Sequence, residues 1–370
     1  MTMVVTPWEV RGEIDYDRLI REFGTKRITP ELLERIKKHT GDLHFLLRRG
    51  IFFSHRDLDW ILDEYERGNR FYLYTGRGPS ENVHIGHLVP WVLTKWLQDR
   101  FGAKLYFQMT DDEKYLFKRN LELEEANRLA YENALDVIAL GFDPDKTFIF
   151  SDIDYAKTLY REAIKVAKRL TLSTAKAVFG FKNSNNVGEI FFTSMQAVPA
   201  FLESVKTGRN VPCLIPYAID QDAHFRVARD ILPKLGFYKP AAIHSKFVPG
   251  LLRGGKMSAS DPRSAIFTVD DPETVRKKIS AAFTGGRDTA EEQKRLGGRP
   301  EICSVFRYFE FFFEEDDRKL QEIFSECKSG SRVCGDCKEQ LAKKVIGFLE
   351  DHQKKREKAR EVLERFIVRD

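Results

Sequence analysis

Apolar residues in this chain form two kinds of pattern: short uninterrupted runs, and longer stretches in which they recur at helical spacing. The short runs predict buried strands at 71–75, 104–110, 147–151, 212–219 and 241–248. The periodic stretches lie between them, at about 112–141, 155–178 and 222–236, and predict helices. Strands that alternate with helices predict an α/β fold with a Rossmann-type, doubly wound sheet whose strands are mostly parallel.

Helical patterns without strands flank this region on both sides. In 29–41, Thr29 has the position of an N-cap and Pro30 that of the first helical residue. A second helix is predicted in 54–68, with Ser54 as its cap. After Asp271 only helical patterns follow. We therefore predict an N-terminal extension (1–68) that packs on the α/β domain (69–270), and an all-α domain (271–370).

Composition indicates a globular protein. Hydrophobic residues make up 42% and charged residues 32% of the 370 positions, enough chain for two or three domains. The apolar runs are far shorter than the roughly 18 residues that a membrane helix needs, and the N-terminus lacks the pattern of a secretory signal. We therefore expect a cytoplasmic protein without membrane association. The formal charge of +5 permits a polyanionic partner.

A glycine-rich turn follows the first predicted strand. Residues 75–87 read TGRGPSENVHIGH and lead into an amphipathic stretch. Such a strand-to-helix turn exposes backbone N–H groups to which a phosphate can bind. Taken alone, the turn is a weak indication, because glycine-rich turns between strands and helices are common.

A second short segment lies near the far end of the alternating region. Residues 254–260 read GGKMSAS, in which one lysine stands among glycines and small hydroxylated residues. Most loops of this composition are ordinary surface loops. The two segments together, HIGH at 84–87 and KMSAS at 256–260, match in order and spacing the two-part signature of class I aminoacyl-tRNA synthetases.

The resemblance narrows over longer segments. The chain closely resembles tryptophanyl-tRNA synthetases of the archaeal and eukaryotic type in FYLYTGRGPSENVHIGHL, QMTDDEKYLFK, GFDPDKTFIFSD, CLIPYAIDQDAHFRVARD and KMSASDP. LRRGIFFSHRDLD and FTGGRDTAEEQ resemble the same family. The likeness extends over nearly the whole chain, and the long N-terminal appendage of some eukaryotic members is not expected here.

This resemblance implies activation of L-tryptophan with ATP to tryptophanyl-adenylate, followed by transfer to tRNA(Trp). ATP would enter as its Mg²⁺ complex, with no tightly bound cofactor, and the subclass implies a homodimer. The first step is an in-line displacement, in which positioning and charge stabilisation matter more than proton transfer. The catalytic residues implied are Lys256, His84, His87 and Arg77. The ATP-binding residues implied are Thr75, Gly76, Gly78, Gly86, Met257, Ser258 and Ser260.

The chemistry of these residue types fits the roles. His84 and His87 can donate ring N–H bonds to phosphate oxygens, and Lys256 can meet the charge that develops on the leaving pyrophosphate. Asp220 and Asp222 are weaker candidates as magnesium ligands, because Mg²⁺ usually stays on substrate phosphates with one or two carboxylates.

A tryptophan site is implied as well. Glu113, Gln196 and Gln221 would lie near the substrate ammonium, although surface glutamines are the alternative interpretation for the latter two. An indole Nε1–H only donates, so its pocket should present acceptors. Tyr74 and Gln108, at strand ends on the ligand side of the sheet, would supply a hydroxyl oxygen and an amide oxygen.

The all-α region resembles the anticodon-binding domain of the family. Its last helical stretch contains KKREKAR at 354–360, so we weakly assign Lys354, Lys355 and Arg356 to tRNA phosphates. A solvated face with mixed ion pairs is the alternative for these residues.

Three cysteines of this region, Cys327, Cys334 and Cys337, have the spacing C-x6-C-x2-C. No fourth ligand stands at motif spacing, so we predict no metal site and free thiols, with a disulfide or a bound metal left open.

Two other functions remain to be weighed. A tyrosine-specific ligase of the same subclass would share the fold and both signatures. A catalytically inactive, RNA-binding paralogue is the alternative outside enzymes, and the intact HIGH and KMSAS segments argue against it.

Overall fold

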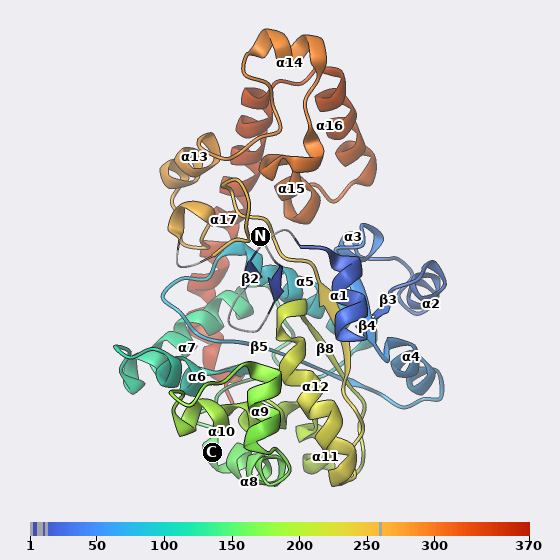
Figure 1. The fold of residues 1–370 in the computed structure, drawn as a ribbon, viewed down its shortest axis with the longest axis vertical. Coiled ribbons are helices and arrows are strands. Elements are labelled where there is room, and N and C mark those ends of the chain that lie inside the picture. The colour runs from blue at the N-terminus through green and yellow to red at the C-terminus, as the bar shows by residue number, and fades with distance from the viewer. Residues whose placement is uncertain (1–2, 6–9, 12–13, 259–260) are drawn as a thin grey trace.

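A seven-stranded sheet forms the centre of the computed structural model, which describes residues 3–5, 10–11, 14–258 and 261–370. The sheet order is β3-β4-β9-β8-β5-β6-β7 (Figure 1). Its strands are β3 (Lys26–Arg27), β4 (Phe52–Arg56), β5 (Tyr72–Arg77), β6 (Leu105–Met109), β7 (Thr147–Ser151), β8 (Cys213–Ala218) and β9 (Ala241–Ser245). The strands from β9 to β7 are parallel, while β4 and β3 extend the β9 edge in antiparallel pairs. The predicted mostly parallel, doubly wound sheet is confirmed.

Helices cover both faces of the sheet because successive residues of each strand point to opposite sides. Leu73, Leu105 and Phe107 belong to one apolar core, and Tyr74 and Tyr106 belong to the other. The first core is closed by α2 (Pro30–Thr40), α3 (Phe45–Arg48), α4 (Leu58–Glu66), α5 (Ile85–Phe101) and α7 (Leu123–Ala139). The second is closed by α8 (Ala156–Ala167), α9 (Leu172–Phe179), α10 (Val187–Met195), α11 (Leu202–Thr207) and α12 (Asp222–Ile231).

The chain before β3 lies beside the sheet, whereas the rest of the predicted N-terminal extension contributes β3 and β4 to it. A short hairpin of β1 (Val4–Val5) and β2 (Val10–Arg11) precedes α1 (Tyr16–Phe23). Leu19 of α1 packs with Phe53 of β4, Ile219 and Phe247 in a third, smaller core. A further helix, α6 (Asp111–Phe117), follows β6 directly.

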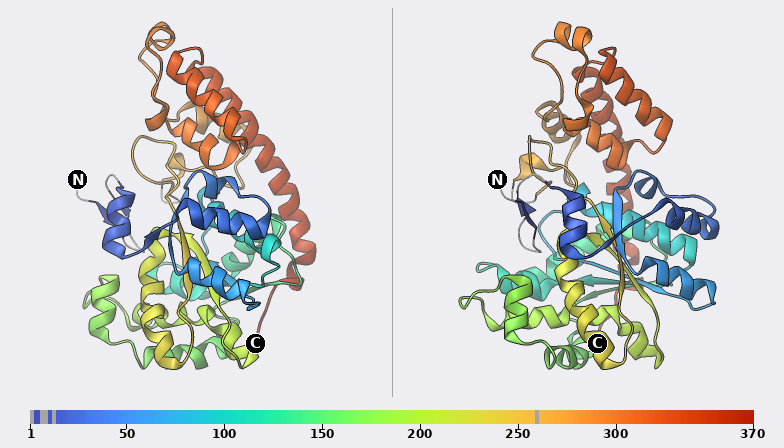
Figure 2. Two further views of the ribbon diagram at one scale, coloured as in Figure 1. Left: turned by 90° about the vertical axis from the view of Figure 1, so that its right-hand side faces the viewer. Right: turned by 45° about the vertical axis from the view of Figure 1, so that its right-hand side comes forward.

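The last hundred residues are helical, and they return to the sheet at their end. The helices are α13 (Pro272–Ser280), α14 (Ala290–Leu296), α15 (Ser304–Tyr308), α16 (Asp317–Ser329) and α17 (Cys334–Val362). Figure 2 shows α17 running from this helical part down one side of the molecule. It packs against α7, where His352 Nε2 lies 2.9 Å from Asp136 Oδ1. Beyond it, the Phe366 carbonyl accepts from the Ile149 N–H of β7 at 2.8 Å.

Three predicted elements differ from the structure. Ser54 does not cap a helix: it lies inside β4, where its Oγ is 2.9 Å from Nδ1 of buried His244. Strand β4 contains polar residues that are buried because they form such hydrogen bonds. Its sequence therefore lacks the continuous apolar run by which the other strands were predicted. Helix α4 begins only at Leu58. The helical stretches predicted over 112–141 and 155–178 are each divided into two helices, α6 and α7 in the first and α8 and α9 in the second.

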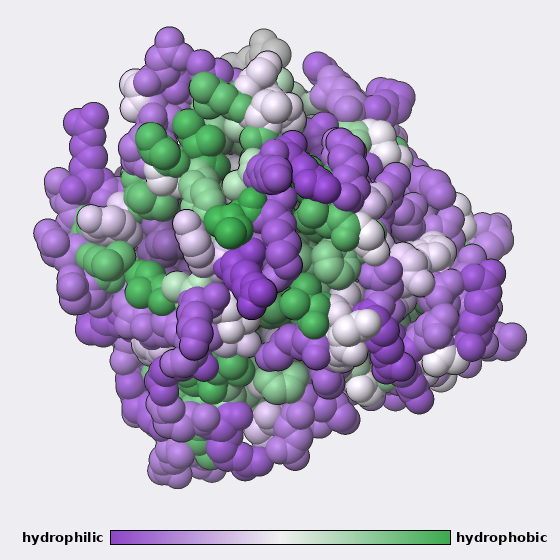
Figure 3. Space-filling model, turned by 90° about the horizontal axis from the view of Figure 1, so that it is seen from below, coloured by the Kyte–Doolittle hydropathy of each residue, from purple (hydrophilic) through white to green (hydrophobic). Residues whose placement is uncertain are grey.

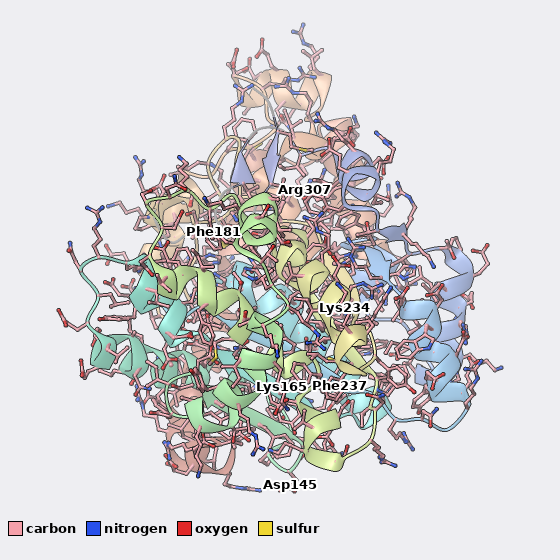
Figure 4. The ribbon with its side chains drawn as sticks, turned by 60° about the horizontal axis from the view of Figure 1, so that its bottom comes forward. Asp145, Lys165, Phe181, Lys234, Phe237 and Arg307 are labelled. Atoms are coloured by element: carbon pink, nitrogen blue, oxygen red, sulfur yellow. The ribbon has the colours of Figure 1, made fainter. Side chains whose placement is uncertain are left out.

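The base of the molecule exposes several apolar side chains. Helix α8 presents Tyr160 and Ile164, which are 55% and 45% exposed, and Leu172 at the start of α9 is 54% exposed. Seen from below, apolar side chains form separate groups among polar ones (Figure 3). Figure 4 shows Lys165 of α8 and Phe237 near the middle of the same side. Within the described residues, no helix is both long and apolar enough to span a membrane.

Candidate active site

The predicted site residues gather where the parallel strands end. The last four residues of β5 are Tyr74, Thr75, Gly76 and Arg77, and Gln108 is the next-to-last residue of β6. Helix α5 starts after β5, and η2 (Ile219–Gln221) follows β8. Ligands of doubly wound sheets bind at this carboxyl edge. The sheet topology therefore places segments far apart in sequence at one edge.

The HIGH segment forms the start of α5. His84 is the N-cap residue, and its backbone N–H donates to His87 Nδ1 at 3.2 Å. The two imidazole rings stack with centroids 3.4 Å apart. Burial lowers the pKa of His84 to about 3 and that of His87 well below its ordinary value, with a further lowering of both by the Arg77 charge. Both rings are therefore neutral at pH 7.

The protonation of these rings decides what they can offer. Because His87 Nδ1 accepts a hydrogen bond, the neutral ring carries its proton on Nε2 and can donate from there. Nδ1 of His84 is buried and has no hydrogen-bond partner among the described residues. Gly86 lies against this ring, since a Cβ at that position would be 3.0 Å from His84 Nδ1. Any side chain at position 86 would crowd the space beside the two histidines.

The KMSAS segment contacts the HIGH segment directly. The Gly86 N–H donates to Met257 Sδ at 3.3 Å, and the Ile85 N–H donates to the Ile266 carbonyl at 3.0 Å. Lys256 Nζ lies 3.2 Å from Oδ2 of Asp220, which is 7% exposed. The Ser258 N–H donates to Ser264 Oγ at 3.2 Å. Ser260, predicted to bind ATP, lies outside the described residues.

Positive charge surrounds the histidine pair. Burial is the main cause of the lowered His84 pKa, and the charges of Arg77 and Lys256 lower it further. Two hydrogen bonds hold the Arg77 side chain: its Nε donates to Asn133 Oδ1 at 3.2 Å, and its Nη2 donates to Ser80 Oγ at 2.5 Å. Two cations beside neutral imidazole donors form an environment suited to a polyphosphate.

The remaining predicted ATP residues lie along the end of β5. Gly76 has no room for a side chain, because a Cβ would be 2.8 Å from the Gln108 carbonyl oxygen. At Gly78 a Cβ would meet the flexible end of the Lys114 side chain, which would have to move aside. Thr75 is turned toward β8, where its Oγ1 donates to the Pro216 carbonyl at 3.1 Å. Its side chain thus fixes the strand, and only its backbone faces the site region.

Tyr74, Gln108 and Gln196 are brought together by hydrogen bonds. The Tyr74 hydroxyl donates to Gln108 Oε1 at 2.5 Å and lies 3.1 Å from the Gln196 carbonyl oxygen. Gln196 Nε2 donates to the Tyr74 hydroxyl oxygen at 2.8 Å. Tyr74 and Gln108 are both fully buried. Gln196 is therefore tied into the site and is not a free surface glutamine.

Glu113 and Gln221 occupy opposite sides of this edge. Glu113 of α6 accepts from Thr110 Oγ1 at 2.7 Å, and its other oxygen is 3.4 Å from Lys114 Nζ. Gln221 ends η2, directly after Asp220 and next to the start of α12. Asp222 is fully buried and held by two 2.8 Å bonds from Arg56, so its oxygens are already occupied.

Three acids near the ends of β6 and β7 were not predicted as site residues: Asp111 and Asp152 are buried, and Asp112 is half-buried. Asp152 follows β7 and accepts both bonds of the Gln108 amide group, while Asp111 and Asp112 begin α6. A usable signal was present in SDID at 151–154, where acids follow directly on a buried strand. Acids at a strand end are common, however, and nothing in the sequence pairs them with Gln108.

The basic residues assigned to tRNA lie on α17, away from this edge. Lys354 and Lys355 are exposed, and Lys355 pairs with Asp351 on the same helix. Arg356 is instead engaged with α7, where it lies 3.0 Å from Glu132 and 3.2 Å from Asp136.

The cysteines are free thiols in the structure. Cys303, Cys327, Cys334 and Cys337 line one small apolar cavity of about 20 Å³ between α15, α16 and α17. Burial raises the pKa of Cys337 to about 12. No group of three or more histidine, cysteine or acidic side chains in the described part of the chain is arranged to hold a metal ion.

Comparison with known proteins agrees with this geometry. The family model described as tRNA synthetases class I (W and Y) matches residues 66–350. The chain is 53% identical to a tryptophan–tRNA ligase of Pyrobaculum calidifontis, over 98% of this chain and 97% of that protein. It is 54% identical to the corresponding ligase of Thermococcus onnurineus, over 98% and 93%.

Solved structures show the same similarity. The tryptophanyl-tRNA synthetase of Plasmodium falciparum superposes with a TM-score of 0.88 at 42% identity, covering 93% of this chain and 94% of the other. That of Giardia lamblia gives a TM-score of 0.89 at 39% identity, covering 96% of both chains.

Proposed function

The chain belongs to the family of class I tRNA synthetases for tryptophan and tyrosine, and from this premise we propose that it is a tryptophan–tRNA ligase. It activates L-tryptophan with ATP to tryptophanyl-adenylate, releases diphosphate, and transfers the tryptophanyl group to tRNA(Trp). The observation that carries this function is the 53–54% identity to tryptophan–tRNA ligases over 98% of the chain. It favours tryptophan over tyrosine and an active ligase over an inactive paralogue.

We propose that the HIGH and KMSAS segments act as one phosphate-binding unit. The tryptophan carboxylate attacks the α-phosphorus of ATP in line, and diphosphate leaves. Neutral His84 and His87 donate to phosphate oxygens, while Arg77 and Lys256 stabilise the growing negative charge. The direct Gly86–Met257 contact supports this assignment, because it joins the two segments in one place. One charge contact made mainly in the transition state is typically worth about 3–4 kcal/mol.

We propose that Mg²⁺ arrives with ATP and stays on its phosphates. Asp222 does not fit as a ligand, since it is buried and paired with Arg56 and Arg226. Asp220 has one buried oxygen without a partner among the described residues, but its other oxygen pairs with Lys256. As the reaction proceeds, the Lys256 ammonium group would leave the Asp220 carboxylate or contact both this carboxylate and diphosphate.

The tryptophan site we propose consists of Tyr74, Gln108 and Gln196 at the indole end and Glu113 with Gln221 toward the ammonium. The hydrogen bonds that join the first three support it, because they assemble acceptors at one place.

We propose further that residues 1–68, 69–270 and 271–370 act as extension, catalytic domain and anticodon-binding domain, and that the enzyme works in the cytoplasm as a homodimer. Exposed Tyr160, Ile164 and Leu172 at the base are the apolar side chains we propose as contacts for the second copy. A fully active monomer in sedimentation at nanomolar concentration would contradict the dimer.

The decisive experiment for the function is ATP–pyrophosphate exchange without tRNA, run separately with tryptophan and tyrosine. We expect exchange with tryptophan and almost none with tyrosine. Exchange that prefers tyrosine would establish the tyrosine ligase, and no exchange with either would favour the inactive paralogue.

A further inference from the structure

A chain of buried hydrogen bonds runs behind the proposed indole site. Asp152 accepts from Gln108 Nε2 through both carboxyl oxygens, at 2.8 and 2.9 Å. Gln108 Oε1 accepts from the Tyr74 hydroxyl, whose oxygen in turn accepts from Gln196 Nε2. Asp152 is 1% exposed, and Gln108 and Tyr74 are 0% exposed. Each polar group is thus fixed by the next, without solvent between them.

The far end of the chain is anchored by a second acid. A side-chain hydrogen bond joins the carboxyls of Asp112 and Asp152. Burial, and then the charges of Asp112 and Asp111, raise the pKa of Asp152 well above its ordinary value. These causes favour the neutral form of the Asp152 carboxyl, with Asp112 as its neighbouring acid. Toward Gln108 both Asp152 oxygens act as acceptors.

This arrangement determines which way the Gln108 amide faces. A glutamine amide can be turned by 180° at almost no cost in shape, which exchanges its donor and acceptor. With acceptors on the Asp152 side, the NH₂ group must face Asp152 and the oxygen must face Tyr74. The reverse orientation would place an oxygen against the Asp152 oxygens and an NH₂ group beside the proposed indole N–H.

We propose that Asp152 is a positioning residue that fixes the Gln108 amide with its oxygen toward the substrate, and so makes the site selective for a ring that carries an N–H donor. The inference rests on the proposed function, in which Tyr74 and Gln108 receive the indole. Asp152 touches no substrate. It acts through Gln108, and Asp112 acts through Asp152.

The test compares two substrates in three proteins. The substrates are tryptophan and the analogue in which sulfur replaces the indole N–H, and the readout is the ratio of their kcat/KM values in pyrophosphate exchange. In Asp152→Leu the acceptors behind Gln108 are lost, so tryptophan should lose roughly 10- to 100-fold in kcat/KM, mostly through KM. The sulfur analogue should lose much less, and the ratio should fall accordingly.

The conservative variant supplies the rescue. Asp152→Asn keeps one side-chain oxygen that can accept from Gln108 Nε2, and its NH₂ group can donate to Asp112. It should keep the substrate ratio of the wild-type chain. Asp111→Asn is the matched control, because Asp111 is equally buried and bonds Ser151 and Asn127 instead of Gln108. If Asp152→Leu is insoluble, Asp152→Ala takes its place.

Each outcome of this comparison either supports or overturns the role proposed for Asp152. A collapsed ratio in Asp152→Leu with a retained ratio in Asp152→Asn and Asp111→Asn supports the role. Equal losses for both substrates in Asp152→Leu, or the same collapse in Asp111→Asn, would reduce Asp152 to a structural residue. A wild-type chain without tryptophan-dependent exchange would overturn the proposed function instead, so the two failures are distinguishable.

Discussion

Lys256 shows how one side chain can be tested apart from its loop. In the structure it pairs with Asp220 and is only partly exposed. If it stabilises charge on leaving diphosphate, Lys256→Ala should lower adenylate formation by roughly 10²–10³-fold with little change in tryptophan Kd. The measurement is single-turnover exchange together with equilibrium binding. Arg253→Ala, an exposed cation in the same loop, is the control and should stay within about twofold. A weakened ground-state affinity with kcat unchanged would show that Lys256 serves binding.

Substitution of Gln108 and Tyr74 tests how the site recognises the indole of tryptophan. Gln108→Leu should raise the KM for tryptophan and narrow its advantage over phenylalanine, since burying an indole N–H without an acceptor costs about 1–3 kcal/mol. Tyr74→Phe should act in the same direction but more weakly, because Gln108 remains. The KM for ATP should stay near the wild-type value in both. Values of kcat/KM for tryptophan, tyrosine and phenylalanine test this, and an unchanged preference in both variants would exclude these two residues from indole recognition.

Between elements, the ion pair of Arg56 in β4 with Asp222 in α12 joins the N-terminal part to the catalytic edge. Arg56 also donates to the Phe23 and Gly24 carbonyls after α1. Burial raises the pKa of Asp222, but the bonds from Arg56 outweigh it, so the pKa in the folded chain is lowered. Such a carboxylate stabilises the fold above its unfolded pKa, and the contribution is lost as the pH falls through the folded pKa.

Arg56→Met should therefore lower the free energy of unfolding by roughly 3 kcal/mol at pH 7. The deficit should shrink at about pH 4, near the ordinary pKa of an aspartate, because protonation of Asp222 then removes the buried charge that Arg56 no longer compensates. Urea unfolding at the two pH values measures this. Arg18→Met, which breaks the exposed pair with Glu22, should cost less than about 1 kcal/mol at both. A deficit that does not depend on pH would mean that Arg56 contributes through its carbonyl contacts alone.

Elements with a clear periodic or apolar pattern could be predicted from the sequence, and those built on buried polar residues could not. The runs at 71–75 and 147–151 correspond to β5 and β7, and Thr29 caps α2 as its spacing indicates. Strand β4 was missed because Ser54 and His55 interrupt its apolar residues, and their burial depends on partners such as His244, 190 positions away. The same limit explains Asp152: its bond to Gln108 is tertiary, and no local pattern specifies it.

For the molecule as a whole, α17 connects the helical part to the α/β part and complicates the assignment of its basic residues. Arg356 and Arg360 both reach Glu132 of α7, and Arg356 also reaches Asp136. These contacts hold α17 against the core of the sheet domain. Lys354 and Lys355 on the same turns are exposed, so they remain able to meet a polyanion. One helix thus carries both a structural and a proposed RNA-binding face.

Substitutions on the two faces of α17 should have different effects. Lys354→Gln with Lys355→Gln should weaken tRNA charging and reduce its dependence on salt by roughly 1 in log–log slope for each lost phosphate contact, while pyrophosphate exchange without tRNA stays intact. Arg356→Gln leaves Asp136 with His352 as its remaining partner, so it should lower thermal stability and reduce exchange and charging in parallel. For each protein, tRNA charging is measured at several salt concentrations, and pyrophosphate exchange is measured at one salt concentration. A melting curve gives the thermal stability. If the double lysine variant loses exchange as much as charging, α17 supports the catalytic domain on both faces. If it changes neither, the tRNA is bound elsewhere on the molecule.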